Sequence, residues 1–215
     1  MYVKTSDETE MDDITIWSET KKGGKVVERF PPSATSIDLS DRRIGTTDLS
    51  VLNQFSGIEA LTLSGNEIQN IDLSPLRESG LLLELSLGGN EIDLIDLAPL
   101  EGCTSLMHLD LSFNRIKAIN LTPLVNCKDL KALHLYENKL ESIDLSVLSK
   151  CKKLRNLTLE KNQLETVDVS PLFLCPNLIK FGIDQVTTLT ASSKLNDQSK
   201  VPIGLKPHLS RIEWN

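Results

Sequence analysis

The stretch Leu106-Met-His-Leu-Asp-Leu-Ser-Phe-Asn-Arg-Ile116 decides the fold of this chain. Two of its leucines alternate with another residue, so Leu109 and Leu111 point to one face of an extended segment while Asp110 points to the other. Asn114 follows three residues after Leu111, where the chain has to turn. The pattern predicts a short, half-buried β-strand followed by a turn.

The same pattern returns every 24 residues. The asparagine recurs at Asn66, Asn90, Asn114, Asn138 and Asn162, and the first apolar position recurs at Ile58, Leu82, Leu106, Leu130, Leu154 and Leu178. One such strand can neither pair its own backbone nor bury its own leucines, but copies one period apart can stack in parallel and do both. We therefore expect about seven stacked repeats, in which each asparagine amide bonds the backbone of its turn.

The repeated unit resembles the leucine-rich-repeat family, in particular its short-repeat branch, over roughly residues 34–185. The resemblance implies a right-handed α/β solenoid with a parallel β-sheet on the concave face and short helical turns on the convex face. The convex segments agree, because Ser74, Thr122 and Ser170 each precede a proline, which predicts a hydroxyl N-cap followed by proline at the first helical position. Aspartates precede these turns and are interpreted as solvated turn residues rather than a cation ladder: Asp48, Asp72, Asp96, Asp144 and Asp168.

The ends of the chain depart from the repeat. Residues 1–13 are rich in acids and are expected to form a flexible arm. Residues 14–33 predict a β-hairpin around Lys21-Lys-Gly-Gly24 that covers the exposed end of the core. Residues 186–215 lack the period and are expected to form a C-terminal cap in which Trp214 packs on the last repeat.

Composition and charge narrow the class of protein. The 215 residues carry a net charge of −7, with a pI near 5.1, which is the wrong sign for a general phosphate binder. No run of apolar residues is long enough to span a membrane, and the first residues lack the basic and apolar regions of a signal peptide. We expect a cytoplasmic, monomeric protein that binds neither nucleic acid nor membranes.

The four cysteines share the repeat, since Cys103, Cys127, Cys151 and Cys175 also lie 24 residues apart. A cysteine fixed to one repeat position behaves as a small apolar residue, so a buried column of reduced thiols is expected. A zinc site would need close pairs such as C-x-x-C, whose ligands converge on one point. No metal and no cofactor are expected.

Function has to lie where the repeats differ, at the strand positions that face away from the core. The largest side chains at these positions gather on two adjacent strands: His108, Asp110, Phe113, His134 and Tyr136, with Glu84, Glu137, Asn156 and Glu160 at the rim. Exposed aromatic residues beside charged ones are typical anchors of protein interfaces. The sequence predicts a non-enzymatic module whose concave face binds a protein or peptide.

Other interpretations of this surface remain open. His108, Asp110 and His134 could hold a metal ion, or could imitate a hydrolase site together with Ser112, although a concave sheet offers no oxyanion hole or deep pocket. Residues 127–162 carry eight Lys or Arg against five acids, which could steer an acidic partner. As some short-repeat relatives do, the chain could serve as a regulatory subunit of a phosphatase or of a GTPase cycle.

Overall fold

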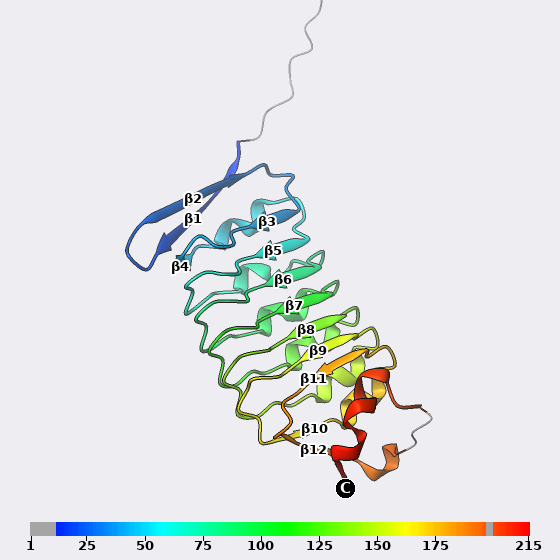
Figure 1. The fold of residues 1–215 in the computed structure, drawn as a ribbon. Helices are drawn as coiled ribbons and strands as arrows, with labels where there is room; N and C mark the ends of the chain where they lie inside the picture. Colours follow the sequence, from blue (N-terminus) through cyan, green and yellow to red (C-terminus); the bar gives the residue numbers. More distant parts are fainter. Residues whose placement is uncertain (1–11, 197–199) are drawn as a thin grey trace, which may run out of the picture.

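The computed structural model describes residues 12–196 and 200–215, so the expected acidic arm lies outside the described residues up to position 11. Seven parallel strands form one continuous sheet along the length of the molecule (Figure 1). They are β3 (Ser36–Asp38), β5 (Ala60–Thr62), β6 (Glu84–Ser86), β7 (His108–Asp110), β8 (Ala132–His134), β9 (Asn156–Thr158) and β11 (Lys180–Gly182). The predicted parallel sheet is confirmed.

The strands pair in the register of the repeat. Leu109 in β7 lies opposite Leu85 in β6 and Leu133 in β8, and all three side chains are fully buried. The ladder continues past the strand ends, where the Phe113 N–H donates to the Tyr136 carbonyl at 2.8 Å. Equivalent residues of successive repeats therefore form straight columns across the concave face.

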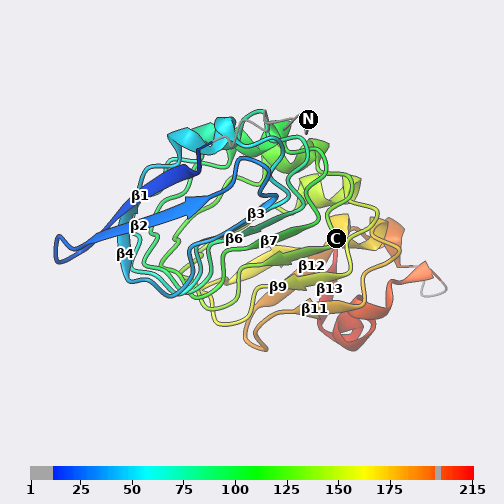
Figure 2. The ribbon, with the colours of Figure 1, turned by 90° about the horizontal axis from the view of Figure 1, so that it is seen from above.

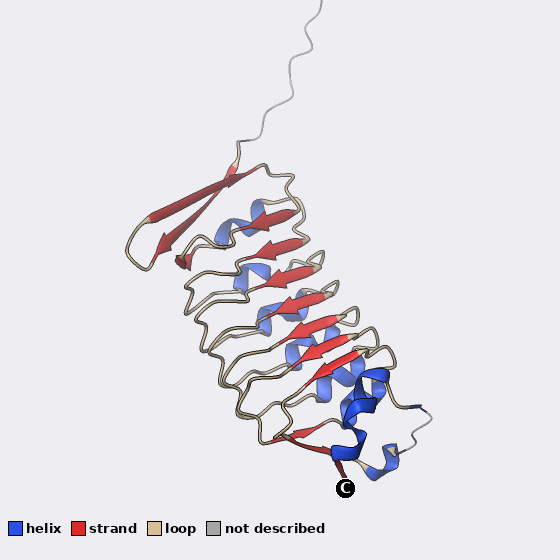
Figure 3. Cartoon of the chain, viewed as in Figure 1, coloured by secondary structure: helices blue, strands red, loops and turns tan. Residues whose placement is uncertain are grey.

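Short 3-10 turns follow the strands on the convex side, as Figures 2 and 3 show. They are η1 (Ser50–Gln54), η2 (Ser74–Leu76), η3 (Ala98–Gly102), η4 (Thr122–Asn126), η5 (Ser146–Lys150) and η6 (Ser170–Leu174). These turns confirm the predicted helical segments of the convex face. Within the part of the chain that is described, no helix has the length and apolar character needed to cross a membrane.

The predicted hydroxyl N-caps of Ser74, Thr122 and Ser170 are wrong. In η2 the N-cap residue is Leu73, which makes no side-chain cap. The Asp72 carboxylate instead accepts the Ser74 N–H and the Ser74 hydroxyl, both at 2.8 Å, and these two bonds lower the pKa of Asp72. A charged acceptor binds a hydroxyl donor strongly, so the hydroxyl is used as a donor and the carboxylate closes the turn. The same backbone bond is accepted by Asp48, Asp96, Asn120, Asp144 and Asp168.

The asparagine of each repeat ties it to the preceding one. Asn114 is buried, its Oδ1 accepts the Ile92 N–H at 3.0 Å, and its Nδ2 donates to the carbonyls of Leu87 and Leu111 at 3.0 and 3.1 Å. Asn66, Asn90, Asn138 and Asn162 repeat this arrangement. The amide therefore donates and accepts as the sequence predicts.

The N-terminal end of the core is covered by an antiparallel hairpin of β1 (Ile14–Thr20) and β2 (Lys25–Phe30). Ile16 points inward and is 1% exposed. The sequence did not reveal that β1 also pairs with β4 (Ile44–Thr47), which belongs to the first repeat. This pairing joins the hairpin to the solenoid through backbone hydrogen bonds.

The C-terminal end is closed by a second small sheet and a helical segment. The sheet consists of β10 (Thr166–Asp168), β12 (Thr188–Ala191) and β13 (Ile212–Trp214), and between the last two lie η7 (Ser193–Leu195) and η9 (Ile203–Arg211). In η9, His208 Nε2 lies 3.0 Å from the carbonyl of Phe181 in β11, the edge strand of the seven-stranded sheet. Trp214 packs edge-on against Phe173, with ring centroids 5.7 Å apart, as the sequence predicts.

The four cysteines are unpaired and fully buried in the core. Burial raises the thiol pKa to about 11 for Cys103 and Cys151 and to about 12 for Cys127 and Cys175. The thiolate is the reactive form, and it is disfavoured in this apolar column. The predicted column of buried thiols is confirmed.

Replacing Leu109 by Ala should lower the free energy of unfolding by roughly 2–5 kcal/mol, because it leaves a cavity in a core that neighbouring repeats share. Leu94 offers a matched control, since its side chain is 71% exposed. Leu94→Ala should cost less than about 0.5 kcal/mol. Denaturant unfolding measures both values, and equal losses would show that the buried face is assigned wrongly.

The native thiols should react slowly with an aromatic disulfide reagent at neutral pH, because they are both buried and protonated. Labelling of all four should follow the unfolding of the repeats, and denaturant should accelerate it strongly. Complete labelling of the native protein within the mixing time would contradict the structure.

Candidate functional site

The register brings the sequence-predicted strand residues together. Asp110 in β7 lies directly opposite His134 in β8, and His108 lies opposite Glu84 in β6. Glu84 and His108 are exposed, while Asp110 and His134 are half-buried. Asn156 is half-buried in β9, next to Ala132. These side chains therefore lie on the four adjacent strands β6, β7, β8 and β9.

The polar side chains at the centre are held by their own neighbours. Asp110 Oδ1 accepts the Ser112 N–H at 2.9 Å and the Ser112 hydroxyl at 2.6 Å. His134 Nδ1 lies 3.0 Å from Thr158 Oγ1. Among the described residues, no group of three or more His, Cys, Asp or Glu side chains is arranged to hold a metal ion. The geometry supplies a hydrogen-bonded polar surface, in which the His134 imidazole is bonded to the buried hydroxyl of Thr158.

An aromatic ridge, formed by Phe113, Tyr136, Glu137 and Lys161, follows the ends of β7, β8 and β9. The Phe113 ring is 52% exposed and meets Tyr136 edge to face, with centroids 5.1 Å apart. Lys161 Nζ lies 4.9 Å from the centre of the Tyr136 ring and 3.0 Å from Glu137 Oε2. Tyr136 is therefore half-buried between two neighbours and held in one orientation.

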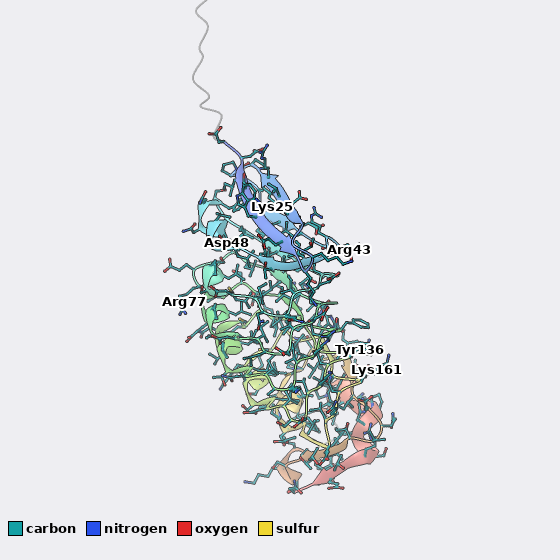
Figure 4. All side chains as sticks on the ribbon, turned by 90° about the vertical axis from the view of Figure 1, so that its left-hand side faces the viewer. Lys25, Arg43, Asp48, Arg77, Tyr136 and Lys161 are labelled. Carbon is teal, nitrogen blue, oxygen red and sulfur yellow. The ribbon has the colours of Figure 1, made fainter. Side chains whose placement is uncertain are left out.

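Figure 4 shows Tyr136 and Lys161 side by side, on the opposite side of the molecule from Arg77 near η2. Interaction with Tyr136, and secondly with Glu137, raises the pKa of Lys161. Sequence reasoning missed Lys161 because a lysine at a turn is normally interpreted as solvated. The 24-residue spacing from Glu137 was the signal that could have found it.

Three of the four ridge residues occupy a left-handed backbone position, which Asp41 occupies in the first repeat. Phe113, Glu137 and Lys161 have φ values of 53°, 54° and 57°, and the equivalent positions of two earlier repeats are Gly65 and Gly89, at 68° and 67°. A left-handed conformation costs an L-residue roughly 1–2 kcal/mol and costs glycine almost nothing. The chain thus keeps strained, bulky side chains where glycine would fit, which is typical of functional surfaces.

Carboxylates lie against the glycines of the concave face. Glu160 is turned toward the last strand, where its carboxylate occupies the space that a side chain at Gly182 would need. The Asp41 carboxylate covers Gly65 in the same way. One oxygen of Glu160 is buried and has no hydrogen-bond partner among the described residues. Glu160, predicted at the rim, therefore lies on the floor of the face, beside the C-terminal cap.

A separate groove lies on the N-terminal hairpin, away from the ridge. It has a volume of about 390 Å³ and is lined by residues of β1, β2 and β4 and by Asp48. Trp17 forms one wall and is 55% exposed, and it lies opposite Val27 on β2. This groove is the second exposed aromatic surface of the described chain.

Comparison with known proteins identifies the repeat. A family model described as "Leucine rich repeat" matches residues 104–164. No curated protein matches this sequence significantly. An internalin, InlF, from Listeria monocytogenes is 25% identical with a TM-score of 0.57, and the match covers 77% of this chain and 51% of that one. Internalin C2 from the same organism is 24% identical with a TM-score of 0.59, and the match covers 83% and 73%.

A plant structure shares the same fold. The leucine-rich-repeat ectodomain of the receptor kinase GASSHO1/SCHENGEN3 from Arabidopsis thaliana, in complex with CASPARIAN STRIP INTEGRITY FACTOR 2, is 22% identical with a TM-score of 0.59. The match covers 66% of this chain and 17% of that one. The chain spans about half the length of the InlF structure. At this level of identity the plant structure shows the fold alone.

Replacing Phe113 by Gly should leave the stability of the solenoid within about 1 kcal/mol of wild type. Relief of the left-handed strain offsets the lost contact with Tyr136, which contributes roughly 0.5–1.5 kcal/mol. Phe113→Ala should be the less stable of the two variants, because alanine keeps the strain without the ring. Denaturant unfolding ranks them, and a more stable alanine variant would contradict the assigned backbone conformation.

Proposed function

Because this chain belongs to the leucine-rich-repeat family, we propose that it is a non-enzymatic module whose concave face binds a protein or peptide, with the aromatic ridge at the centre. The observation that carries this proposal is the exposed Phe113 ring, packed on Tyr136 and kept at a strained backbone position. An apolar ring that is exposed at a conformational cost needs a reason outside the stability of the fold.

The ridge has the properties of a binding hot spot. Aromatic side chains dominate the energetics of many protein interfaces, since they bury a large area with few rotatable bonds. Tyr136 is already fixed between Phe113 and Lys161, so binding would cost little additional side-chain entropy. Glu84, His108, His134 and Asn156 surround the ridge with groups that can hydrogen-bond a partner.

The relatives support a protein ligand. The plant ectodomain is a leucine-rich-repeat structure in complex with CASPARIAN STRIP INTEGRITY FACTOR 2, and the plant peptide hormone receptor RGFR1 in complex with RGF2 has the same fold, so this architecture can present a surface to a ligand. The repeats fix every buried position and leave identity free on the surface. That division suits recognition better than catalysis, which would need convergent groups in a closed pocket.

We also propose a monomer that resides in the cytoplasm. Both ends of the solenoid are covered, by the β1–β2 hairpin and by η9, so neither end presents an open core to a second copy. The four cysteines are unpaired, which suits a reducing compartment. The net charge of −7 supports a partner other than nucleic acid.

Tyr136→Ala should weaken binding of the partner by on the order of 2 kcal/mol or more, because the ring is a central and pre-oriented contact. Partners captured by the intact protein can be compared quantitatively with those captured by Tyr136→Ala combined with Phe113→Gly. Circular dichroism should show that the double variant stays folded.

Val125→Ala is the matched control, because Val125 is an exposed apolar residue in η4 on the convex side. It should leave binding within about twofold of wild type. If binding survives the double change and is lost on replacing Trp17 by Ala, the concave assignment is wrong and the hairpin groove is the binding site.

A further inference from the structure

The concave face carries an excess of acidic side chains. Its outward positions are the first and third residues of each strand and the second and third residues after the strand. The acids at these positions are Asp38, Asp41, Glu84, Asp110, Glu137, Glu160 and Asp184, and the bases are Lys161 and Lys180. Lys161 is already paired with Glu137 at 3.0 Å. The net charge of this face is therefore strongly negative.

The basic residues of repeats five and six lie mostly elsewhere. Lys150 belongs to η5 on the convex side, and Lys152 lies two residues beyond the end of this turn. Lys152 Nζ donates to the Leu174 carbonyl at 2.8 Å, and Lys153 pairs with Asp129 at 2.7 Å. These three lysines therefore lie at or beside the convex turns, and none of them stands at an outward position of the concave sheet.

Several of the concave carboxylates lie directly on the sheet. Asp41 covers Gly65, Glu160 covers Gly182, and a side chain at Gly88 would come within 3.1 Å of an Asp110 carboxylate oxygen. Glycine has no side chain that would hold a neighbouring carboxylate away from the backbone. Asp110 and Glu160 are half-buried there, and partly buried charges are screened by salt much less than exposed ones. A partner on this face would meet carboxylates in six of the seven repeats.

We propose that the concave face binds a basic, extended segment of another protein, which places an apolar side chain against the aromatic ridge and directs Lys or Arg side chains to the carboxylates. This inference rests on the concave binding surface proposed above. Arginine suits the floor best, because its planar guanidinium can bond a carboxylate through two parallel N–H groups. The ridge provides the apolar anchor, and the acids select the charge of the partner.

A displayed library of random peptides, each about a dozen residues long, tests the charge and the location together. The library is selected on wild-type protein, and the enriched peptides are synthesised. Their affinities are measured by fluorescence anisotropy against wild type and three variants. The ridge variant is Phe113→Gly with Tyr136→Ala, and the acid variant is Glu84→Gln with Glu137→Gln. The matched control is Glu78→Gln with Glu101→Gln, which removes the same charge from exposed convex positions.

Peptides with a net positive charge and one large apolar residue should be enriched. The ridge variant should lose their binding by more than about tenfold, as expected for a hot spot. The acid variant should lose about three- to tenfold, as expected for two ion pairs, and the control should stay within about twofold. Affinity should fall as the ionic strength rises above about 0.15 M, with a smaller fall in the acid variant.

Each other outcome contradicts a defined claim. Enrichment of neutral or acidic peptides that depend on the ridge would overturn the basic partner and leave the concave binding surface standing. Equal losses in the acid variant and the convex control would show that attraction is a property of net charge, which also overturns the inference. Enrichment that is indifferent to the ridge variant, or no enrichment at all, would overturn the concave binding surface and the basic partner together.

Discussion

The asparagine amide that follows five of the seven strands is the interaction on which the solenoid depends. Asn114 contacts the backbone of its own turn and that of the preceding repeat, through carbonyls at Leu87 and Leu111 and the N–H of Ile92. Leaving such buried backbone groups unpaired would cost roughly 1–3 kcal/mol for each group. An insertion or deletion between two asparagines would break these bonds, so the 24-residue spacing is maintained. This constraint holds the concave positions in register and turns a linear sequence into columns of neighbouring side chains.

The same constraint fixes the backbone of the turn, whatever residue occupies it. The residue before the asparagine has a left-handed backbone in both Gly89 and Phe113. This conformation costs glycine almost no free energy, whereas it strains phenylalanine. At this position glycine therefore gives the more relaxed backbone, while any other residue adds a surface side chain at the cost of strain. The first repeat contains Asp41 at this position, the next two contain glycine, and the later ones contain Phe113, Glu137 and Lys161 of the aromatic ridge. Strained non-glycine residues at this position thus help to locate a functional surface.

Features set by local spacing could be predicted from the sequence, and features set by side-chain competition or distant pairing could not. The period determined the strand register, the asparagine bonds and the cysteine column. The pairing of β1 with β4 joins segments far apart in sequence and has no local signal. Ser74 and Asp72 are both acceptable capping residues, and only the geometry shows that the carboxylate is the acceptor. The direction of Glu160 depends on the absence of a side chain at Gly182, which lies in the next repeat.

The concave acids combine structural and electrostatic roles. Asp38 accepts the hydroxyl and the N–H of Ser40, and these bonds lower its pKa, so the carboxylate stays ionised in the neutral range. Asp110 makes the same pair of bonds with Ser112. A carboxylate that holds its own turn cannot rotate away from the sheet, and its charge therefore has a fixed position. A fixed charge needs no reorganisation when a partner binds. Such an arrangement selects partners by the sign of their charge more than by a particular sequence.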